Sequence, residues 1–180
     1  HGLACHLDGA RLMNASAASG LAPAQYAQVF DTAYLDFTKG LGAPVGAVLA
    51  GTKGLVEQAL HWKQRLGGAM RQAGILAAAC LYALDNHVER LTDDHDNASL
   101  LATRLSGIEG IAVEPVHTNM VFVNVAGTGQ TAAQFNERLR AHGIRMSAQG
   151  PARLRAVTHL DIQRSDIETC AAACRSIAES

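Results

Sequence analysis

Short apolar runs alternate with stretches of helix-forming residues in the first third of the chain. Residues 3–7, 32–37 and 45–50 have the length and composition of buried strands, whereas residues 10–18 and 23–28 between them are rich in helix formers. Strands and helices that alternate in this way are typical of a parallel sheet covered by helices. The pattern therefore predicts an α/β layer at the start of the chain.

Two longer helical stretches follow. Residues 52–65 predict one helix, which two consecutive glycines end. A second helical region covers about residues 70–105, and we expect it to bend or break at residues 92–97, where polar residues gather. Since so long a helix commonly links two domains, the sequence predicts a first domain at 1–92 and a second at 93–180.

The pattern changes from about residue 107 onward. Residues 119–125, 144–147 and 153–158 predict short strands, and capping boxes at 131–134 and 165–168 predict the starts of two helices. One strand, a helix, two strands and a helix describe a small α/β domain with an antiparallel sheet.

The composition excludes several classes of protein. Apolar residues make up 48% of the chain, aromatic residues only 4%, and the formal net charge is −1 with no basic stripe, which argues against a nucleic-acid surface. The longest apolar run, residues 74–84, is about half of what a bilayer crossing needs. No CxxC pair occurs, so we expect a protein of the reducing cytoplasm. Cys170 and Cys174 share a helix face but lack a second pair of metal ligands, so we expect them to be core residues.

One lysine stands apart from the other charges. Lys39 follows an apolar strand and precedes three glycines in residues 40–46, which let other groups approach closely. This setting suits a lysine that condenses with an aldehyde, with desolvation and nearby positive charge favouring the neutral amine. A lysine at a strand end beside a tight turn explains the segment equally well.

One carboxylate and three arginines extend this hypothesis. Asp8 and Arg11 follow the first strand, and ligands of open parallel sheets bind outside the carboxyl ends of the strands. Arg153 and Arg155 share one face of a later strand, where one of them could bind a carboxylate, although a solvated basic edge is the simpler interpretation. Pyridoxal phosphate requires such a set: a lysine for its aldehyde, a carboxylate for its ring nitrogen and guanidinium groups for an amino-acid substrate.

Rival interpretations of the same segments have less support. The GxGxxxG spacing of residues 40–46 resembles a dinucleotide fingerprint, but Pro44 would interrupt the expected helix. His6 with Asp8, and the acidic residues around His95, lack partner ligands, so we expect no metal site. No GxSxG motif occurs, so serine hydrolase chemistry has no support.

Four motifs in the same order resemble the low-specificity L-threonine aldolases. They are HLDGARLMNA at 6–15, TKGLGAPVG at 38–46, LGGAMRQAG at 66–74 and RAVTHLD at 155–161. The resemblance implies the α/β fold of aspartate aminotransferase, fold type I of the pyridoxal-phosphate enzymes. In that fold the chain would supply the C-terminal portion of the large domain, which contains a parallel sheet, and the small C-terminal α/β domain. It also implies a homo-oligomer, either a dimer or a tetramer, with active sites at subunit interfaces.

The resemblance also implies a role for each candidate residue. Lys39 would bind the cofactor aldehyde covalently, Asp8 would hold the proton on the pyridine nitrogen, and Thr38 would donate a hydrogen bond near the cofactor. Arg11 would lie near the cofactor ring and the substrate carboxylate, and Arg155 would bind the α-carboxylate. This assignment reverses the preference for a solvated edge at Arg155.

The implied activity is retro-aldol cleavage of β-hydroxy-α-amino acids such as L-threonine and L-allo-threonine to glycine and an aldehyde. The resemblance covers only the second half of the family's polypeptide, and the family's phosphate-binding loop, ring-stacking residue and candidate bases lie in the first half. We therefore expect the isolated 180 residues to lack catalysis. A different fold-type-I reaction, β-elimination or transamination, is the first alternative, and a non-catalytic remnant that keeps the fold is the second.

Overall fold

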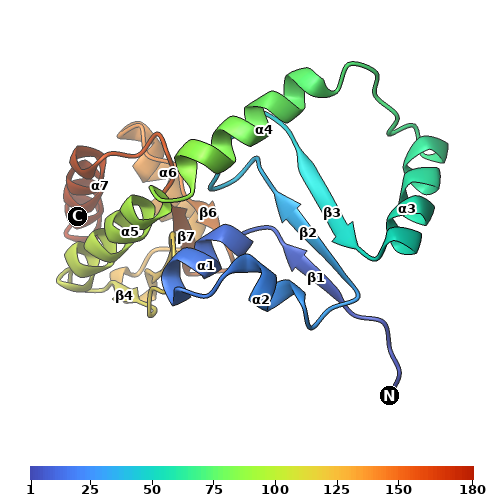
Figure 1. Ribbon diagram of the computed structural model, residues 1–180. Helices are drawn as coiled ribbons and strands as arrows, with labels where there is room; N and C mark the ends of the chain where they lie inside the picture. The colour runs from blue at the N-terminus through green and yellow to red at the C-terminus, as the bar shows by residue number, and fades with distance from the viewer. The chain divides into compact units, whose positions relative to one another are not determined.

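The computed structural model describes residues 1–180, which divide into two compact units, His1–Leu91 and Thr92–Ser180 (Figure 1). The first unit is built on a three-stranded sheet in the order β1-β2-β3. Its elements are β1 (His6–Gly9), α1 (Leu12–Ser19), α2 (Pro23–Ala27), β2 (Thr32–Asp36), β3 (Ala47–Gly51), α3 (Lys53–Arg65) and α4 (Gly74–His87).

The sheet of the first unit is mixed. β1 and β2 are parallel, with Asp8 beside Tyr34, and the chain passes through α1 and α2 between them. β3 runs antiparallel to β2, with Ala47 beside Asp36. Parallel neighbours need a crossover of about a dozen or more residues, and the helix-free turn at 37–46 is too short for one. The predicted parallel pairing therefore holds for β1 and β2, whereas the direction of β3 follows from its turn.

Glycine lets the two parallel strands approach each other closely. A Cβ atom added at Gly9 would lie 1.9 Å from the carbonyl oxygen of Tyr34, which no side chain tolerates. Because Gly9 directly follows Asp8, this close contact fixes the end of β1 beside β2.

The second unit is a four-stranded antiparallel sheet with helices packed on one face, as predicted. The strand order is β4-β5-β7-β6. Its elements are α5 (Leu91–Ser106, which begins at the last residue of the first unit), β4 (Ala112–Val113), β5 (Met120–Asn124), the 3₁₀ turn η1 (Ala126–Thr128), α6 (Ala132–Ala141), β6 (Ser147–Ala148), β7 (Arg153–Val157) and α7 (Arg164–Ala178). The capping box expected at 131–134 is present, since the Gln134 N–H donates to Thr131 Oγ1 over 3.2 Å.

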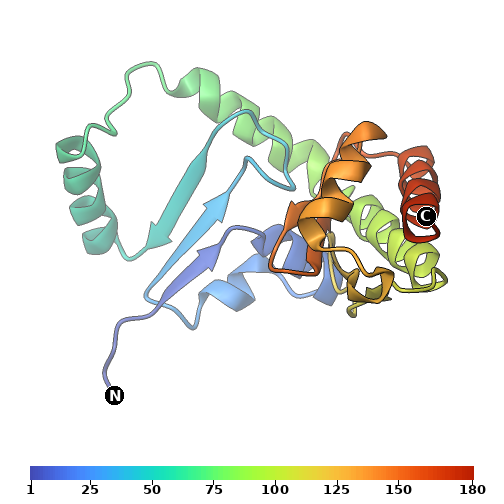
Figure 2. The same cartoon turned by 180° about the vertical axis from the view of Figure 1, so that it is seen from behind.

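The core of the second unit lies between α5, α6 and α7 and one face of the sheet. Leu101 and Leu105 of α5, Phe135 of α6 and Leu154 of β7 are all buried in it. Strand alternation then leaves the residues on the opposite face of β7 half-buried. Figure 2 allows these helices and strands to be followed from behind.

The long helix predicted for residues 70–105 is two helices. α4 begins at Gly74 and ends at His87, and α5 begins at Leu91, so the break lies at residues 88–90 rather than at 92–97. The polar residues that suggested a break, including Asp93 and Asp94, occupy the first turn of α5. Carboxylates are favourable there because the helix dipole is positive at its N-terminus, so this acidic cluster marks the start of a helix.

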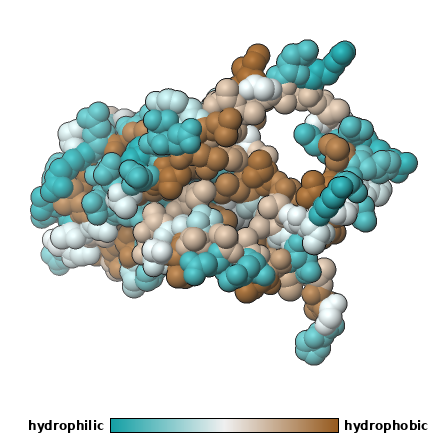
Figure 3. All heavy atoms as spheres, in the orientation of Figure 1, coloured by the Kyte–Doolittle hydropathy of each residue, from teal (hydrophilic) through white to brown (hydrophobic).

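Large apolar side chains remain exposed on the first unit. All five residues of β3 are exposed, and apolar side chains of α3 and α4 also face solvent, several of them visible as brown spheres in Figure 3. The set comprises Val48, Leu49, Leu55, Leu60, Trp62, Ile75, Leu81 and Tyr82. So many large exposed apolar side chains are typical of a region that packs against further protein. None of the helices has the length and apolar content that a bilayer crossing demands.

Candidate active site

The turn that carries Lys39 is anchored on both sides by buried side chains. Phe37 and Leu41 are 3% and 2% exposed and pack with Ala83 of α4 in the small core of the first unit. The Phe37 N–H donates to the carbonyl oxygen of Gly46 over 3.0 Å, which closes the turn at its base. Because its apolar neighbours point inward, Lys39 projects away from this core with 39% of its side chain exposed.

Two glycines of the turn are required by close packing. A Cβ atom at Gly40 would lie 2.6 Å from Asn14 Oδ1 of α1, and one at Gly46 would lie 2.4 Å from Cys80 Sγ of α4. On the α4 side, His87 Nδ1 lies 2.6 Å from the carbonyl oxygen of Leu41. The glycines that the sequence associated with close approach therefore let α1 and α4 hold the turn.

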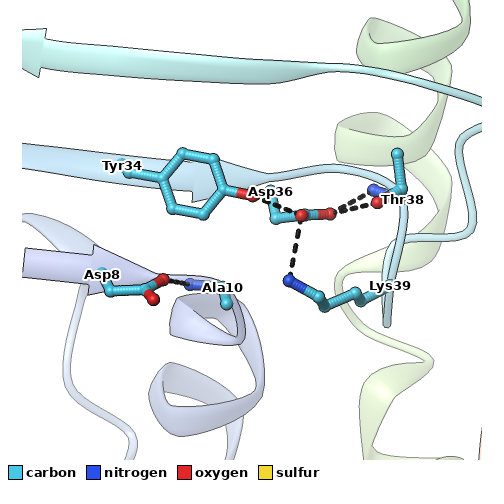
Figure 4. Close-up of polar contacts among 6 residues, drawn as sticks. All are labelled: Asp8, Ala10, Tyr34, Asp36, Thr38 and Lys39. Atoms are coloured by element: carbon cyan, nitrogen blue, oxygen red, sulfur yellow. Dashed lines mark hydrogen bonds and ion pairs between the residues drawn. The ribbon is translucent and has the colours of Figure 1, made fainter.

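The nearest charge to Lys39 is negative. Its Nζ atom lies 3.1 Å from Asp36 Oδ2, at the carboxyl end of β2 (Figure 4). The same carboxylate accepts three more hydrogen bonds: the Thr38 N–H and the Thr38 hydroxyl each donate to Oδ1 over 2.6 Å, and the Tyr34 hydroxyl donates to Oδ2. The sequence-based expectation of a positive neighbour is therefore wrong, because an acidic side chain completes the strand just before the turn.

The environment of Asp36 keeps its carboxyl group ionised. Burial acts to raise the pKa of Asp36, but the hydrogen bonds from Thr38, Tyr34 and Lys39 outweigh it and lower the pKa well below its ordinary value of 3.8. The hydrogen bond to Asp36 is the largest cause that raises the pKa of Tyr34 to about 12, and burial and the charge of Asp8 act in the same direction. Tyr34 therefore remains a protonated hydrogen-bond donor at physiological pH.

Asp8 and Arg11 lie at the end of β1 and the start of α1. Asp8 is exposed, and its Oδ1 accepts a hydrogen bond from the Ala10 N–H over 3.1 Å, which turns the chain out of the strand. Because Asp8 is beside Tyr34 in the parallel pairing, and Asp36 follows two residues later on the same face, both carboxylates lie at the same edge of the sheet. Arg11 is half-buried and is the N-cap residue of α1.

The two arginines of β7 belong to the second unit and have different surroundings. Arg153 forms a bidentate pair with Glu114, with Nε 2.6 Å from one carboxylate oxygen and a terminal nitrogen 2.8 Å from the other, and it stacks 3.9 Å above the Phe122 ring. Arg155 is half-buried, and its Nε atom is buried with no hydrogen-bond partner. A buried N–H without a partner is costly, so of the two arginines Arg155 is the one suited to an anionic ligand.

Cys170, Cys174 and Thr38 interact with other groups of the protein. Cys170 and Cys174 are buried in the core of the second unit, as expected for small core residues. The Thr38 hydroxyl donates its only proton to Asp36. The structure thus brings Asp8, Thr38 and Lys39 together in the first unit.

Sequence reasoning missed two members of this cluster, Tyr34 and Asp36. Both precede Lys39 on the strand that the sequence predicts at 32–37 from its apolar residues. Their spacing of two residues puts them on one face of β2, and an aspartate that ends an apolar strand three residues before a lone lysine is the signal that could have revealed the ion pair.

Comparison with solved structures defines the fold class. The chain superposes on a putative L-allo-threonine aldolase from Listeria monocytogenes with a TM-score of 0.77, at 23% identity, covering 98% of this chain and 52% of that chain. This and further structural neighbours of the same kind have fold type I of the pyridoxal-phosphate enzymes, as the resemblance implied. The observed α/β architecture is therefore part of that fold.

Sequence comparison then identifies the family: the chain belongs to the beta-eliminating lyases, whose family model matches residues 1–128. It is 42% identical over 170 residues to the low specificity L-threonine aldolase of Escherichia coli K12, covering 94% of this chain and 50% of the relative. It is 40% identical to the low-specificity L-threonine aldolase 1 of Arabidopsis thaliana, covering 93% and 48%. The resemblance inferred from the four motifs is confirmed, and the chain spans about half the length of the curated relatives it matches.

Proposed function

We propose that the protein carrying this chain is a pyridoxal-phosphate-dependent aldehyde lyase that cleaves L-threonine-type β-hydroxy-α-amino acids to glycine and an aldehyde. The observation that carries the proposal is the partly exposed amine of Lys39, which is paired with Asp36 just after the carboxyl end of β2, while Asp8 lies near the carboxyl end of the parallel neighbour β1. Identity of 42% to a threonine aldolase over 94% of the chain supports this particular reaction among those of the fold.

The residues at this edge fit the cofactor in type and arrangement. Pyridoxal phosphate, when bound, would supply an aldehyde that condenses with amines and a protonated ring that takes up electrons from a bond broken at the substrate Cα. Lys39 would bind the aldehyde through Nζ, and the exposed carboxylate of Asp8 would hold the proton on the ring nitrogen. Arg11, at the start of α1, would contribute positive charge near the ring.

Thr38 and Arg155 would have more specialised tasks. Because the Thr38 hydroxyl donates to Asp36, we propose that Thr38 acts on Lys39 through that carboxylate rather than as a direct donor to the cofactor. The unpartnered Nε–H of Arg155 supports a role in binding the substrate α-carboxylate with the planar fork of its guanidinium. A carboxylate fixed in this way would set which substrate bond is aligned for cleavage.

The two compact units support the assignment of the chain to two domains. We propose that residues 1–92 are the C-terminal part of the large cofactor-binding domain and that residues 93–180 are the small domain that supplies Arg155. The exposed apolar side chains of β3, α3 and α4 support packing of the first unit against further protein, either the rest of a longer chain or another subunit of a homo-oligomer.

Product analysis of the full-length protein tests the proposed reaction. With L-threonine, L-allo-threonine and phenylserine as substrates, we expect glycine and the matching aldehyde in equal amounts, and we expect Lys39→Ala to abolish both. A 2-oxo acid and ammonia in place of glycine, with 2-oxobutanoate formed from the two threonines and phenylpyruvate from phenylserine, would establish β-elimination, the reaction for which the matched family is named. A full-length protein that releases neither set of products would support the non-catalytic alternative.

A further inference from the structure

The two oxygens of the Asp36 carboxylate have different hydrogen-bond partners. Oδ1 accepts both hydrogen bonds from Thr38, which fix the side chain to its own turn. Oδ2 accepts the hydrogen bond from the Tyr34 hydroxyl and faces Lys39 Nζ at 3.1 Å. The carboxylate is only 8% exposed, so it cannot rotate away from Lys39 without breaking several bonds at once.

This arrangement pairs Lys39 with one buried carboxylate. Because Tyr34 and Thr38 supply only neutral donors, Lys39 is the single cation bonded to the buried carboxylate. Other ionisable groups on elements packed around the turn are Asp8 on β1, Arg11 at the start of α1, and Cys80 and His87 on α4. Asp8 adds a second negative charge at the same edge of the sheet.

We propose that Asp36 is a positioning residue that holds the Lys39 side chain in place through this ion pair and so restrains its reaction with aldehydes until a ligand displaces the pair. The inference rests on the proposed function for the identity of that aldehyde. The pairing itself is independent of the cofactor, and a test without the cofactor can therefore examine it separately.

The substitution Asp36→Asn removes this one interaction selectively. The asparagine oxygen can replace Oδ1 and accept both bonds from Thr38, while its NH₂ group can donate to the Tyr34 oxygen. The same NH₂ group cannot accept a hydrogen bond from the Lys39 ammonium. The variant therefore keeps the shape and the internal bonds of the turn and loses the charge that faces Lys39.

Competitive labelling of lysines with acetic anhydride measures the effect. The cofactor-free, full-length protein is labelled at pH 8, and mass spectrometry compares Lys39 with Lys63, an exposed lysine of α3 that serves as an internal reference. We expect Asp36→Asn to raise the Lys39-to-Lys63 ratio about fivefold, since loss of the ion pair releases the Lys39 amine for reaction. Asp85→Asn, which removes an exposed carboxylate of α4, should leave the ratio unchanged.

The wild-type protein provides a second measurement if Asp36→Asn does not fold. We expect its Lys39-to-Lys63 ratio to be below one at pH 8, because the ion pair with Asp36 restrains the Lys39 amine. An unchanged ratio in a folded Asp36→Asn protein, or a wild-type ratio above one at pH 8, would overturn the inference. Borohydride trapping with pyridoxal phosphate separates the two proposals: an adduct on Lys39 with no effect of Asp36→Asn rejects only the role of Asp36, whereas a labelling effect without any adduct rejects only the proposed function.

Discussion

At the scale of single residues, the candidate site combines a partly exposed lysine with a buried carboxylate that several hydrogen bonds fix. Lys39 is the partly exposed member of the cluster, whereas Asp36 is held by Tyr34 and Thr38 through hydrogen bonds that also keep it ionised. Two arginines of β7 differ in a similar way. Arg153 forms an ion pair with Glu114, whereas the buried Nε–H of Arg155 has no hydrogen-bond partner. We therefore expect function at the partly exposed amine of Lys39 and at the unpartnered Nε–H of Arg155.

A pair of lysine substitutions tests this contrast on β7. Arg155→Lys retains the charge but loses the planar fork, so we expect KM for L-threonine to rise about 10- to 100-fold, corresponding to a lost charge-assisted hydrogen bond of about 1.5–3 kcal/mol. Arg153→Lys, the matched control, weakens a pair that lies within the protein and should change KM less than about twofold. Steady-state kinetics of the full-length variants would contradict the assignment if Arg155→Lys kept the wild-type KM or if Arg153→Lys had the larger effect.

At the scale of elements, the site depends on how closely β1 approaches β2. Gly9 lies where an added Cβ atom would meet the backbone of Tyr34, whereas Gly54 in the first turn of α3 has nothing within 4 Å of its added Cβ. The same change, glycine to alanine, should therefore have opposite effects at the two positions.

We expect Gly9→Ala to lower the free energy of unfolding by about 1–3 kcal/mol, because β1 must move away from β2. It should also weaken cofactor binding, since Asp8 moves with the strand. Gly54→Ala should raise the stability by up to about 1 kcal/mol through helix propensity. Urea unfolding of both full-length variants measures the two shifts, and a Gly9→Ala protein as stable as the wild type would refute the close contact.

Much of this arrangement could be predicted from local sequence patterns. The strands near 32–37 and 153–158 and the capping box at 131–134 follow from alternation and side-chain capping, and the structure contains all three. The antiparallel direction of β3 follows from the short turn at residues 37–46, which allows no crossover, and the spacing of the two strands could have revealed it. The break at residues 88–90 could not be predicted, because it depends on packing of Leu91 with Phe37 and Leu41, which are distant in the sequence. The Asp36–Lys39 pair does not follow from the strand pattern. The apolar neighbours of Asp36 define the strand, and only the negative charge of Asp36, three residues before Lys39, indicates the ion pair.

At the scale of the whole molecule, the chain contains two folded units, and large apolar side chains remain exposed on the first of them. The small core of the first unit around Phe37 and Leu41 holds the Lys39 turn, while Trp62, Ile75 and Leu81 remain exposed. The chain also spans about half the length of the relatives it matches. Cofactor binding should therefore be tested on the full-length protein. This chain contains three lysines that could bind the cofactor aldehyde covalently.

The most direct test of the central claim is to locate the lysine that binds pyridoxal phosphate. The full-length protein is incubated with the cofactor, reduced with borohydride, digested and mapped by mass spectrometry, with Lys39→Arg as a control that retains the charge. The account predicts a pyridoxyl group on the peptide that contains Lys39, none on Lys53 or Lys63, and none in Lys39→Arg. A pyridoxyl group on any other lysine, or on no lysine of the full-length protein, would contradict it.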